Sequence, residues 1–293
     1  MTEVITSSSF LAIDWGTTNR RLYVINSGQA KFVERDNIGA LALTVADFPK
    51  EVERLKAAFG NIPMLLAGMV GSNRGWIDAG YIPVPAELAS LVHAAVSPMP
   101  NVEVLPGLSL IRGDRYDVMR GEEVQFFGAV AAGLVPTECQ LCQPGTHSKW
   151  AQMANGAIVD FTTAMTGEMF AVLKDHSLIG HDMQGEVSVN SAFNEGVDEA
   201  ISDDLLAALF GARSATLLGR RSSADTASFV SGLLIGSDVR AHARSEEDVY
   251  VLSDPSLGPL YCHAINRLGG RAVLVDSATA FVAGMAALQE IKR

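Results

Sequence analysis

Apolar runs separated by short polar turns predict regular elements along the first hundred residues. The predicted elements are strands at 9–15, 20–26 and 30–35, a helix from Asp47, a strand at 62–68, a helix at 86–96 and a strand at 102–107. The first helix is indicated by Val52, Leu55 and Phe59, which recur at helical spacing. Only a few polar residues join the first two strands, so we expect a hairpin there.

A similar order follows in the second part of the chain, after a helix predicted over 118–134. The later elements are strands at 139–143, 147–153 and 156–162, helices at 191–209 and 224–243, a strand at 248–253, a helix at 258–268, a strand at 271–275 and a helix at 278–291. The repeated order predicts a duplicated α/β architecture of two lobes. We place these lobes at 1–118 and 119–293, with the last helix packing near their junction.

Composition excludes several classes of protein. The net charge of −11 argues against broad attraction to nucleic acid or to an anionic membrane. The N-terminal residues 1–10 lack the basic start and apolar core of a signal peptide. The longest uncharged apolar run, 126–136, is about half of the roughly 20 residues that span a bilayer. We therefore expect a cytoplasmic protein.

Cys139 and Cys142 form a Cys-x-x-Cys pair within a predicted strand. Residues three apart on a strand point to opposite faces of the sheet. The chain has 3 cysteines, so no second pair completes a zinc site. We expect buried, unreactive thiols here.

Two predicted hairpin tips combine a glycine with short hydrogen-bonding side chains. The first, DWGTTN at 14–19, adds an aspartate, and the second, PGTHSK at 144–149, adds a lysine. Backbone N–H groups and hydroxyls in such turns suit anionic oxygen. Neither a P-loop nor a dinucleotide-binding G-x-G-x-x-G motif occurs in the chain. One such tip is usually an ordinary turn, but two at equivalent places could clamp a polyphosphate.

The two tips resemble the first and second phosphate motifs of the superfamily of actin, heat-shock ATPases and sugar kinases. Within it, the chain resembles the 2-dehydro-3-deoxygalactonokinase family. The matching segments are AIDWGTTNRR (12–21), AGMVGSNRGW (67–76), VMRGEEVQFFGA (118–129), PGTHSKW (144–150), AMTGE (164–168), HSLIG (176–180) and SGLLIG (231–236).

The resemblance implies an α/β fold of two ribonuclease-H-like, actin-like ATPase lobes with an interlobe active-site cleft. It also implies transfer of the γ-phosphoryl group of ATP, with Mg²⁺, to the C6 hydroxyl of 2-dehydro-3-deoxy-D-galactonate. The N-terminal lobe would then carry the first phosphate motif and the sugar-acid contacts. The C-terminal lobe would carry the second motif and the adenosine site.

Phosphoryl transfer needs positioning and charge neutralisation, which the two tips can supply. We expect Asp14, a catalytic residue at a strand end, to hold Mg²⁺, largely through water. Arg21 is preferred to Arg20 because adjacent side chains on a strand face opposite ways. The expected phosphate contacts are Gly16, Thr17, Thr18, Asn19 and Arg21 in the first tip, and Gly145, Thr146 and the catalytic Lys149 in the second.

The resemblance places the general base at the start of the helix that joins the lobes. Related sugar kinases carry a Gly-Asp-Gln segment there, whereas this chain has MRGEE, with Glu122 after Gly121. A carboxylate is electrostatically favoured at a helix N-terminus, and a base must reach the acceptor hydroxyl. We take Glu122 as the base and Glu123 as the reserve candidate. Both glutamates could instead only cap the helix.

The segment GMVGSNRGW (68–76) is expected to contact the sugar acid. Gly71 allows close backbone approach, and Ser72 and Asn73 can pair with hydroxyl groups. Trp76 is either an apolar wall of this site or a core residue. The substrate carboxylate needs a cation. The candidates for it are Arg112, Arg115 and Arg120, of which we select Arg120.

Superfamily members hold adenosine with a glycine-rich turn after a strand of the second lobe. Here the predicted strand 248–253 ends at Asp254 and Pro255, and proline removes a backbone donor. We expect Ser253 and Asp254 at the adenosine, with Asp254 accepting from a ribose hydroxyl. The residues whose roles stay open are Thr166, Gly167 and Glu168, near the phosphates or the sugar, and His147, a phosphate donor or a structural turn residue.

Three other functions remain open at this point. The chain could phosphorylate another small sugar or sugar acid, or act as a non-catalytic nucleotide or sugar sensor. A sensor need not keep Asp14, Glu122 and Lys149 together, as this chain does. A phosphatase is a third option, less favoured because a kinase must exclude water from its cleft. The sequence does not decide the oligomeric state, and a homodimer is left open.

Overall fold

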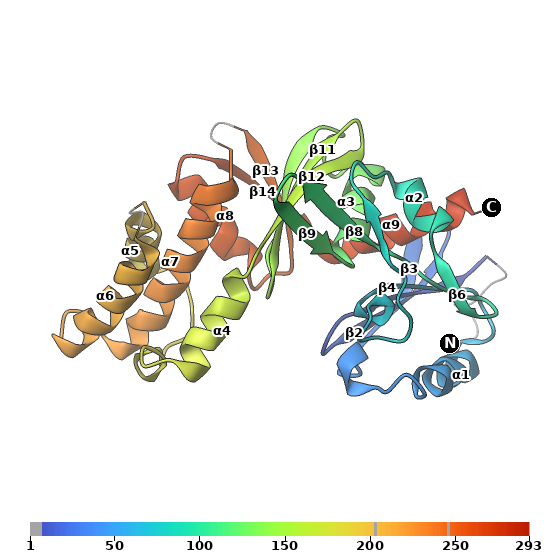
Figure 1. Ribbon diagram of the computed structural model, residues 1–293, viewed down its shortest axis with the longest axis horizontal. Coiled ribbons are helices and arrows are strands. Elements are labelled where there is room, and N and C mark those ends of the chain that lie inside the picture. Colours follow the sequence, from blue (N-terminus) through green and yellow to red (C-terminus); the bar gives the residue numbers. More distant parts are fainter. Residues whose placement is uncertain (1–7, 202–203, 245–246, 293) are drawn as a thin grey trace. The chain divides into compact units, whose positions relative to one another are not determined.

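The computed structural model describes residues 8–201, 204–244 and 247–292 (Figure 1). Residues 1–7, most of the segment that shows no signal-peptide pattern, lie outside this range. Contacts divide the chain into two units. The first holds described residues up to 138, with 152–161 and 277–292, and the second holds 139–151 and the described part of 162–276.

The first unit contains a six-stranded sheet in the order β3-β2-β1-β4-β7-β6. Its strands are β1 (Phe10–Trp15), β2 (Arg20–Asn26), β3 (Gln29–Asp36), β4 (Met64–Gly68), β6 (Val96–Met99) and β7 (Val102–Val104). β1 runs antiparallel to β2 and parallel to β4, and β4 runs parallel to β7. Leu11, Ile13 and Trp15 are buried on β1, so the hairpin is anchored in the core.

Helices and a small sheet complete the first unit. They are α1 (Phe48–Phe59), α2 (Leu88–His93), α3 (Glu122–Ala131), α9 (Ser277–Ile291) and the strands β5 (Tyr81–Pro83), β8 (Gly107–Arg112) and β9 (Arg115–Met119). The short 3-10 turns are η1 (Ala40–Ala42) and η2 (Met69–Gly71). The apolar face predicted for α1 is confirmed, because Val52, Leu55 and Phe59 are all buried.

Two helix predictions in this unit are wrong in extent. The range 118–134 begins as strand β9, and α3 starts only at Glu122, because Gly121 has a φ of 106° that breaks the apolar run. The range 86–96 holds the short helix α2 and the start of β6. Pro98 and Pro100 follow it, and prolines disfavour helix in the residues before them.

A five-stranded sheet has the order β12-β11-β10-β13-β14. Contacts assign most of it to the second unit, but residues 152–161, at the end of β11 and the start of β12, to the first. The strands of this sheet are β10 (Cys139–Gln143), β11 (Ser148–Ala154), β12 (Ala157–Ala164), β13 (Asp248–Ser253) and β14 (Arg271–Asp276). β10 runs parallel to β13, and β13 runs parallel to β14. This order repeats that of β3-β2-β1-β4-β7, so the predicted duplicated, ribonuclease-H-like α/β architecture is confirmed.

The helices of the second unit are α4 (Thr166–His176), α5 (Ser191–Glu199), α6 (Leu205–Leu217), α7 (Ser223–His242) and α8 (Gly258–Arg267), with the 3-10 turn η3 (Gly180–Asp182). The single helix predicted over 191–209 is two helices, because the Asp204 carboxylate accepts from Ala207 N–H and starts α6. That range includes residues 202–203, which lie outside the described chain. α4 was not predicted, since it buries no residue and shows no apolar periodicity.

The helices α3 and α9 pack closely within the first unit. A Cβ placed on Gly128 would lie 1.9 Å from the carbonyl oxygen of Ala280, and one placed on Gly284 would lie 2.3 Å from that of Val124. The two backbones therefore touch where glycines face each other. This contact assigns both helices to the first unit, so the division differs from the lobes at 1–118 and 119–293 expected from the sequence.

Cys139 and Cys142 are buried thiols, as expected. Burial raises the pKa of Cys139 to about 11 and that of Cys142 well above its usual range. Within the described part of the chain, no group of three or more His, Cys, Asp or Glu side chains is arranged to hold a metal ion. Among the same residues, none of the helices combines the length and the apolar character needed to cross a membrane.

Candidate functional site

The first hairpin tip turns at the end of β1. Gly16 N–H donates to Asn19 O at 2.9 Å, which closes the turn. Thr17 and Thr18 are exposed, and the amide of Asn19 donates to Thr18 Oγ1 at 3.0 Å. The tip thus presents hydroxyl and amide groups to solvent while its strands remain in the core.

The two arginines that follow the tip face opposite ways, as strand geometry requires. Arg20 is fully buried, pairs with Asp36 and Glu51, and lies 4.7 Å from the centre of the Trp15 ring. Arg21 is partly exposed, and its Nη1 lies 3.6 Å from Asp14 Oδ2. Arg21 therefore shares the face of Asp14, whereas Arg20 is buried on the opposite face of the strand.

Asp14 lies in an electrostatically unusual environment. Burial raises the pKa of Asp14 to about 6, the Arg21 guanidinium lowers it, and the Glu122 carboxylate raises it. The start of α3 lies close to the end of β1, next to Asp14. A Cβ on Gly121 would lie 3.2 Å from the Cα of Gly68, and Gly68 is paired with Trp15 in the parallel register. The structure therefore brings Asp14, Arg21 and Glu122 together.

The two glutamates at the start of α3 differ in exposure. Glu122 is partly exposed, and its Oε2 accepts from Arg120 N–H at 3.1 Å. Glu123 is fully buried, and both of its oxygens accept from Gly121 N–H, at 2.9 and 2.7 Å. Burial, with the Glu122 charge, raises the pKa of Glu123 to about 8. Glu123 accepts from the N-cap residue of its own helix, and Glu122 is the more accessible of the two carboxylates.

The residues of the 68–76 segment have different environments. Trp76 packs in the core, where it stacks on Phe48 with the ring centres 5.8 Å apart, so core packing is its observed role. Ser72 Oγ is buried and donates to Met69 O at 2.8 Å inside the turn. Asn73 is exposed, and Gly71 leaves room for Arg120, whose Nη1 lies 3.0 Å from a Cβ placed on that glycine.

The three candidate arginines differ in their burial and in the groups that they contact. Arg112 and Arg115 are largely exposed and both pair with Asp160, at 2.6 and 3.1 Å. Arg120 is buried, with 4% of its side chain exposed. Its Nη2 donates to Gly80 O at 2.9 Å, and its guanidinium lies 4.3 Å from the centre of the Tyr81 ring. Among the described residues, its Nε and Nη1 have no hydrogen-bond partner.

The second hairpin tip borders a pocket of about 280 Å³. The pocket is lined by Gly145, Thr146, Thr166, Gly167, Phe170, Val187, Ser231, Leu234, Ile235, Leu257, Leu260 and Tyr261. None of these side chains carries a charge at neutral pH. One part of the lining is apolar, and the glycines and hydroxyls of the tip and of α4 form the rest. This combination suits a ligand that has an apolar ring system and polar substituents.

The start of α4 is fixed directly on this tip. Glu168 N–H donates to Thr146 O at 2.9 Å. A Cβ on Gly167 would lie 2.4 Å from Gly145 O, so the two segments meet at a distance that only glycine permits. The Thr-Gly pair of the AMTGE segment is therefore part of the pocket, next to Gly145 and Thr146.

Several expected residues of the second unit lie away from this pocket. Lys149 is 4% exposed, and its Nζ donates to His147 O at 3.1 Å. Asp254 Oδ1 accepts from Ser256 N–H at 3.0 Å and from its hydroxyl, which makes a local turn. Ser253 is buried at the end of β13. Leu257 and Leu260 line the pocket in place of the expected Ser253 and Asp254.

His147 lies outside the pocket lining as well. Its Nε2 lies 2.6 Å from Glu168 Oε2, a contact that links the tip to the first turn of α4. The sequence also left Ser231, Leu234 and Ile235 without a role, although they belong to the SGLLIG motif and line the pocket. Their place in a family motif was the signal that could have assigned them.

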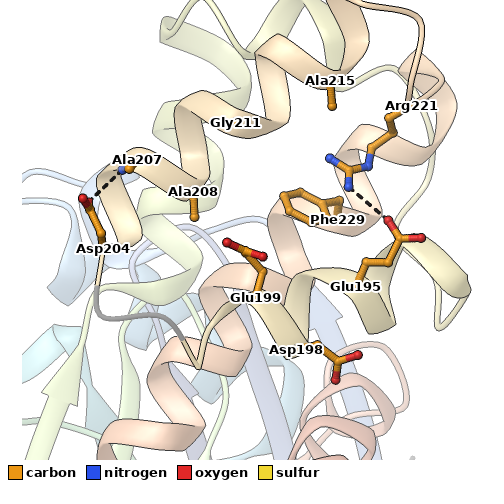
Figure 2. Close-up of a pocket in the computed structure, with 10 residues that line it drawn as sticks. All are labelled: Glu195, Asp198, Glu199, Asp204, Ala207, Ala208, Gly211, Ala215, Arg221 and Phe229. Atoms are coloured by element: carbon orange, nitrogen blue, oxygen red, sulfur yellow. Dashed lines mark hydrogen bonds and ion pairs between the residues drawn. The ribbon is translucent and has the colours of Figure 1, made fainter.

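A larger groove of about 660 Å³ lies in the second unit between α5 and α6 (Figure 2). Its residues are Glu195, Asp198, Glu199, Asp204, Ala207, Ala208, Gly211, Ala215, Arg221 and Phe229. Four of them are carboxylates, and Arg221 pairs with Glu195 at 3.1 Å. Because this excess of negative charge repels phosphate, the groove is not the candidate nucleotide site.

Comparisons with known proteins decide the family. The family model described as 2-keto-3-deoxy-galactonokinase matches residues 14–288. The chain belongs to the 2-keto-3-deoxy-galactonokinase family. The 2-dehydro-3-deoxygalactonokinase of Escherichia coli (strain K12) is 34% identical over 290 residues, which is 95% of this chain and 97% of that protein. The family assignment from the sequence is thereby confirmed.

Solved structures agree with this family assignment. A crystal structure of a candidate 2-dehydro-3-deoxygalactonokinase from Sinorhizobium meliloti is 32% identical, has a TM-score of 0.88, and is matched over 95% of this chain and 97% of that one. Component A of the (R)-2-hydroxyglutaryl-CoA dehydratase of Acidaminococcus fermentans is 12% identical, with a TM-score of 0.54 and coverage of 97% and 99%. The second match shows that this galactonokinase-family chain shares its two-sheet fold with a distant protein.

Proposed function

We propose that this protein transfers the γ-phosphoryl group of ATP to the C6 hydroxyl of 2-dehydro-3-deoxy-D-galactonate and forms the 6-phosphate. The observation that carries this proposal is the cluster of Asp14, Arg21 and Glu122 at the first tip, in a family named for this kinase. Catalysis of phosphoryl transfer is mostly positioning and electrostatic stabilisation, which such a cluster of opposite charges can supply.

In this reaction the C6 oxygen forms a bond to the γ-phosphorus, the bond to the β–γ bridging oxygen breaks, and ADP leaves. The proton of the hydroxyl must move to a base within hydrogen-bond reach. Glu122 is our candidate for that base, because it is partly exposed and follows Gly121 at the start of α3. Glu123 is buried and occupied in capping, which leaves it a structural role.

The residues around Asp14 fit Mg²⁺. Two neighbouring carboxylates in a partly buried position favour a bound cation, and their mutual repulsion contributes to the raised pKa of Asp14. Mg²⁺ is commonly held by one or two carboxylates together with water and substrate phosphates. Asp14 would hold the ion, which when bound neutralises phosphate charge. The exposed hydroxyls of Thr17 and Thr18 and the partly buried amide of Asn19 would donate hydrogen bonds to phosphate oxygens.

The pocket of the second unit supports binding of the nucleotide. Its glycines and hydroxyls, from Gly145, Thr146 and Thr166, suit the phosphates, and its apolar lining suits the base. Lys149 would have to leave His147 O before it could reach a phosphate. We therefore assign the phosphate contacts here to the tip and the start of α4. Lys149 would add a contact only after its hydrogen bond to His147 O is broken.

Arg120 favours a sugar acid over a neutral sugar. A buried guanidinium with two unpartnered nitrogens, Nε and Nη1, is costly unless a ligand satisfies them. A carboxylate matches the planar fork of arginine, and 2-dehydro-3-deoxy-D-galactonate carries one. The pairing of Arg112 and Arg115 with Asp160 leaves Arg120 as the preferred contact.

The test is ADP release with MgATP and a panel of acceptors. The panel holds 2-dehydro-3-deoxy-D-galactonate, its gluconate epimer, glycerol and hexoses. We expect turnover with the first compound and much less with the neutral acceptors. Preference for a neutral sugar would show that the sugar acid is not the substrate and that Arg120 does not bind a substrate carboxylate. Nucleotide binding without turnover on any acceptor would favour a sensor.

A further inference from the structure

Three hydrogen bonds converge on Asp238, a buried carboxylate of α7 that no sequence motif had singled out. Its Oδ1 accepts from Trp150 Nε1–H at 2.8 Å. Its Oδ2 accepts from the hydroxyls of Thr166 and Tyr261, each at 2.7 Å. The residue is 6% exposed, so solvent plays little part in satisfying its charge.

Asp238 lies directly behind the pocket of the second unit. Leu234 and Ile235, one turn earlier on α7, line that pocket, as do Thr166 and Tyr261. Asp238 itself is not part of the lining. It joins the first residue of α4 to the aromatic side chain of α8, and so connects the polar and the apolar parts of the pocket wall.

The network also extends to the strand that follows the second tip. Ser148 Oγ lies 2.7 Å from the Tyr261 hydroxyl. Thr166 precedes Gly167, which rests on the carbonyl of Gly145. Fixing the Thr166 hydroxyl therefore fixes the first turn of α4 against the tip that contains Gly145 and Thr146.

The charge of Asp238 is compensated mainly by neutral donors. Its ionic contact among the described residues is with His242, whose Nε2 lies 3.8 Å from Oδ1. Burying a carboxylate that has mainly neutral hydrogen-bond donors as partners costs free energy. An apolar side chain of similar size would often stabilise the fold as well or better. An ionised carboxylate has one property that an amide lacks, because both of its oxygens only accept hydrogen bonds.

We propose that Asp238 is a positioning residue of the nucleotide pocket, and this inference rests on the proposed function. By accepting from Trp150, Thr166 and Tyr261 at once, it sets the hydroxyl rotamers and the distance between α4 and α8. An asparagine can accept through one oxygen only, so its NH₂ group must face a donor or reverse a hydroxyl. The pocket would then lose its defined width and its fixed phosphate-side hydroxyl.

The experiment measures affinity for MgADP by calorimetry without any acceptor, together with KM for each substrate. We expect Asp238→Asn to weaken MgADP binding about tenfold and to raise KM for ATP similarly, with KM for the sugar acid unchanged. Thr166→Val and Tyr261→Phe each remove one donor and should weaken binding about three- to fivefold. The Asp238→Asn and Thr166→Val effects should combine less than additively, since they remove one shared hydrogen bond.

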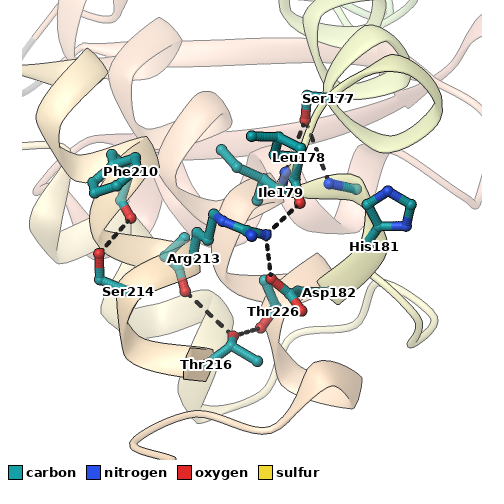
Figure 3. Close-up of polar contacts among 12 residues, drawn as sticks. Ser177, Leu178, Ile179, His181, Asp182, Phe210, Arg213, Ser214, Thr216 and Thr226 are labelled. Carbon is teal, nitrogen blue, oxygen red and sulfur yellow. Dashed lines mark hydrogen bonds and ion pairs between the residues drawn. The ribbon is translucent and has the colours of Figure 1, made fainter. Parts of the chain in front are cut away.

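A matched control exists elsewhere in the same unit. In the polar cluster of Figure 3, Arg213 Nη1 donates to Leu178 O at 2.8 Å and lies 3.4 Å from Asp182 Oδ2, and the hydroxyls of Thr216 and Thr226 lie 3.0 Å apart. None of these residues lines the nucleotide pocket. Asp182→Asn should lower Tm without changing the affinity for MgADP.

Each outcome bears on the proposal. Unchanged MgADP affinity in Asp238→Asn, or an equal loss in Asp182→Asn, would reduce Asp238 to a structural residue and overturn the positioning role. A wild-type protein that binds no adenine nucleotide would overturn the proposed function along with it. If Asp238→Asn does not fold, Thr166→Val and Tyr261→Phe decide, and wild-type affinity in both would reject the proposal.

Discussion

The two hairpin tips occupy the same place in the same strand order, yet their surroundings differ in charge. Asp14, Arg21 and Glu122 gather at the first tip. The pocket beside the second tip is lined by uncharged side chains alone. A duplicated sheet thus fixes where a polar turn is presented, and the neighbouring segments decide its chemistry.

The neighbouring segment is in each case the start of a helix. In the first unit Gly121 rests on Gly68 and places Glu122 beside Asp14. In the second unit Gly167 rests on Gly145 and places the hydroxyl of Thr166 at the pocket. The same type of glycine contact therefore delivers a carboxylate to one tip and a neutral donor to the other. Substitutions should separate a catalytic tip from a binding tip.

The largest effect is expected at the proposed base. Glu122→Gln should lower kcat by about 10²–10⁴-fold, since general base catalysis contributes that much. The affinity for MgADP, assigned to the other unit, should stay within about twofold of the wild type. The measurement is steady-state turnover together with calorimetric binding. Near-normal turnover in this variant would move the base to another residue.

Asp14→Asn should follow closely in size. Removing the carboxylate that would hold Mg²⁺ is expected to lower kcat/KM by roughly 10²-fold and to raise the Mg²⁺ concentration required for half-maximal activity. A titration of Mg²⁺ at fixed ATP measures the second effect. The same Mg²⁺ requirement in the variant and the wild type would contradict the assignment.

Arg120→Lys tests the carboxylate contact. It keeps the charge but loses the planar fork, so we expect KM for the sugar acid to rise roughly ten- to fiftyfold while KM for ATP is unchanged. Arg112→Ala is the matched control, because Arg112 pairs with Asp160 and should leave both KM values as they are. Equal changes in both KM values for Arg120→Lys would indicate a structural role.

Gly167→Ala acts on the uncharged tip. The added Cβ would meet Gly145 O at 2.4 Å, and forcing such a contact costs about 1–3 kcal/mol. We expect KM for ATP to rise about tenfold with kcat less affected. Gly211→Ala is the control, since a Cβ there meets nothing within 4 Å. If Gly167→Ala behaves like Gly211→Ala, α4 does not shape the pocket.

The smallest effect on activity is expected for Glu123→Gln, which changes stability instead. The pKa of Glu123 is raised from 4.5 to about 8, so the folded protein keeps a proton that the unfolded chain has released. The free energy of unfolding therefore falls as pH rises between these values. Glutamine does not titrate, so the Tm of the variant minus that of the wild type should increase from pH 5 to pH 8. A constant difference would contradict the raised pKa.

The fold was largely predictable because strand patterns are local. The prediction of a strand at 248–253 matches β13 in full, and its apolar residues Val249, Val251 and Leu252 are buried. The region 118–134 was not predictable in the same way. The spacing of its apolar residues does not change between β9 and α3, so the pattern gives no sign of a boundary. The boundary is set by the backbone conformation of Gly121, which lies between the strand and the helix.

The candidate site was predictable in part. Asp14 and Glu122 belong to motifs, and their closeness follows from where strand ends and helix starts meet. The direction of Lys149 was not predictable, because it depends on a hydrogen bond to His147 O within its own turn. Asp238 had no motif signal at all, since its role arises from three donors far apart in the sequence.

The close contact of α3 with α9 has a consequence for how the protein is made. The ribosome completes β1 and α3 early, but α9, which backs α3 through Gly128 and Gly284, is among the last segments to emerge. The whole second unit is synthesised between them. Domains fold largely as their residues leave the ribosome, so the second unit can fold while the first still waits for its final helix. The helix that starts with Glu122 is therefore fully supported only when synthesis ends.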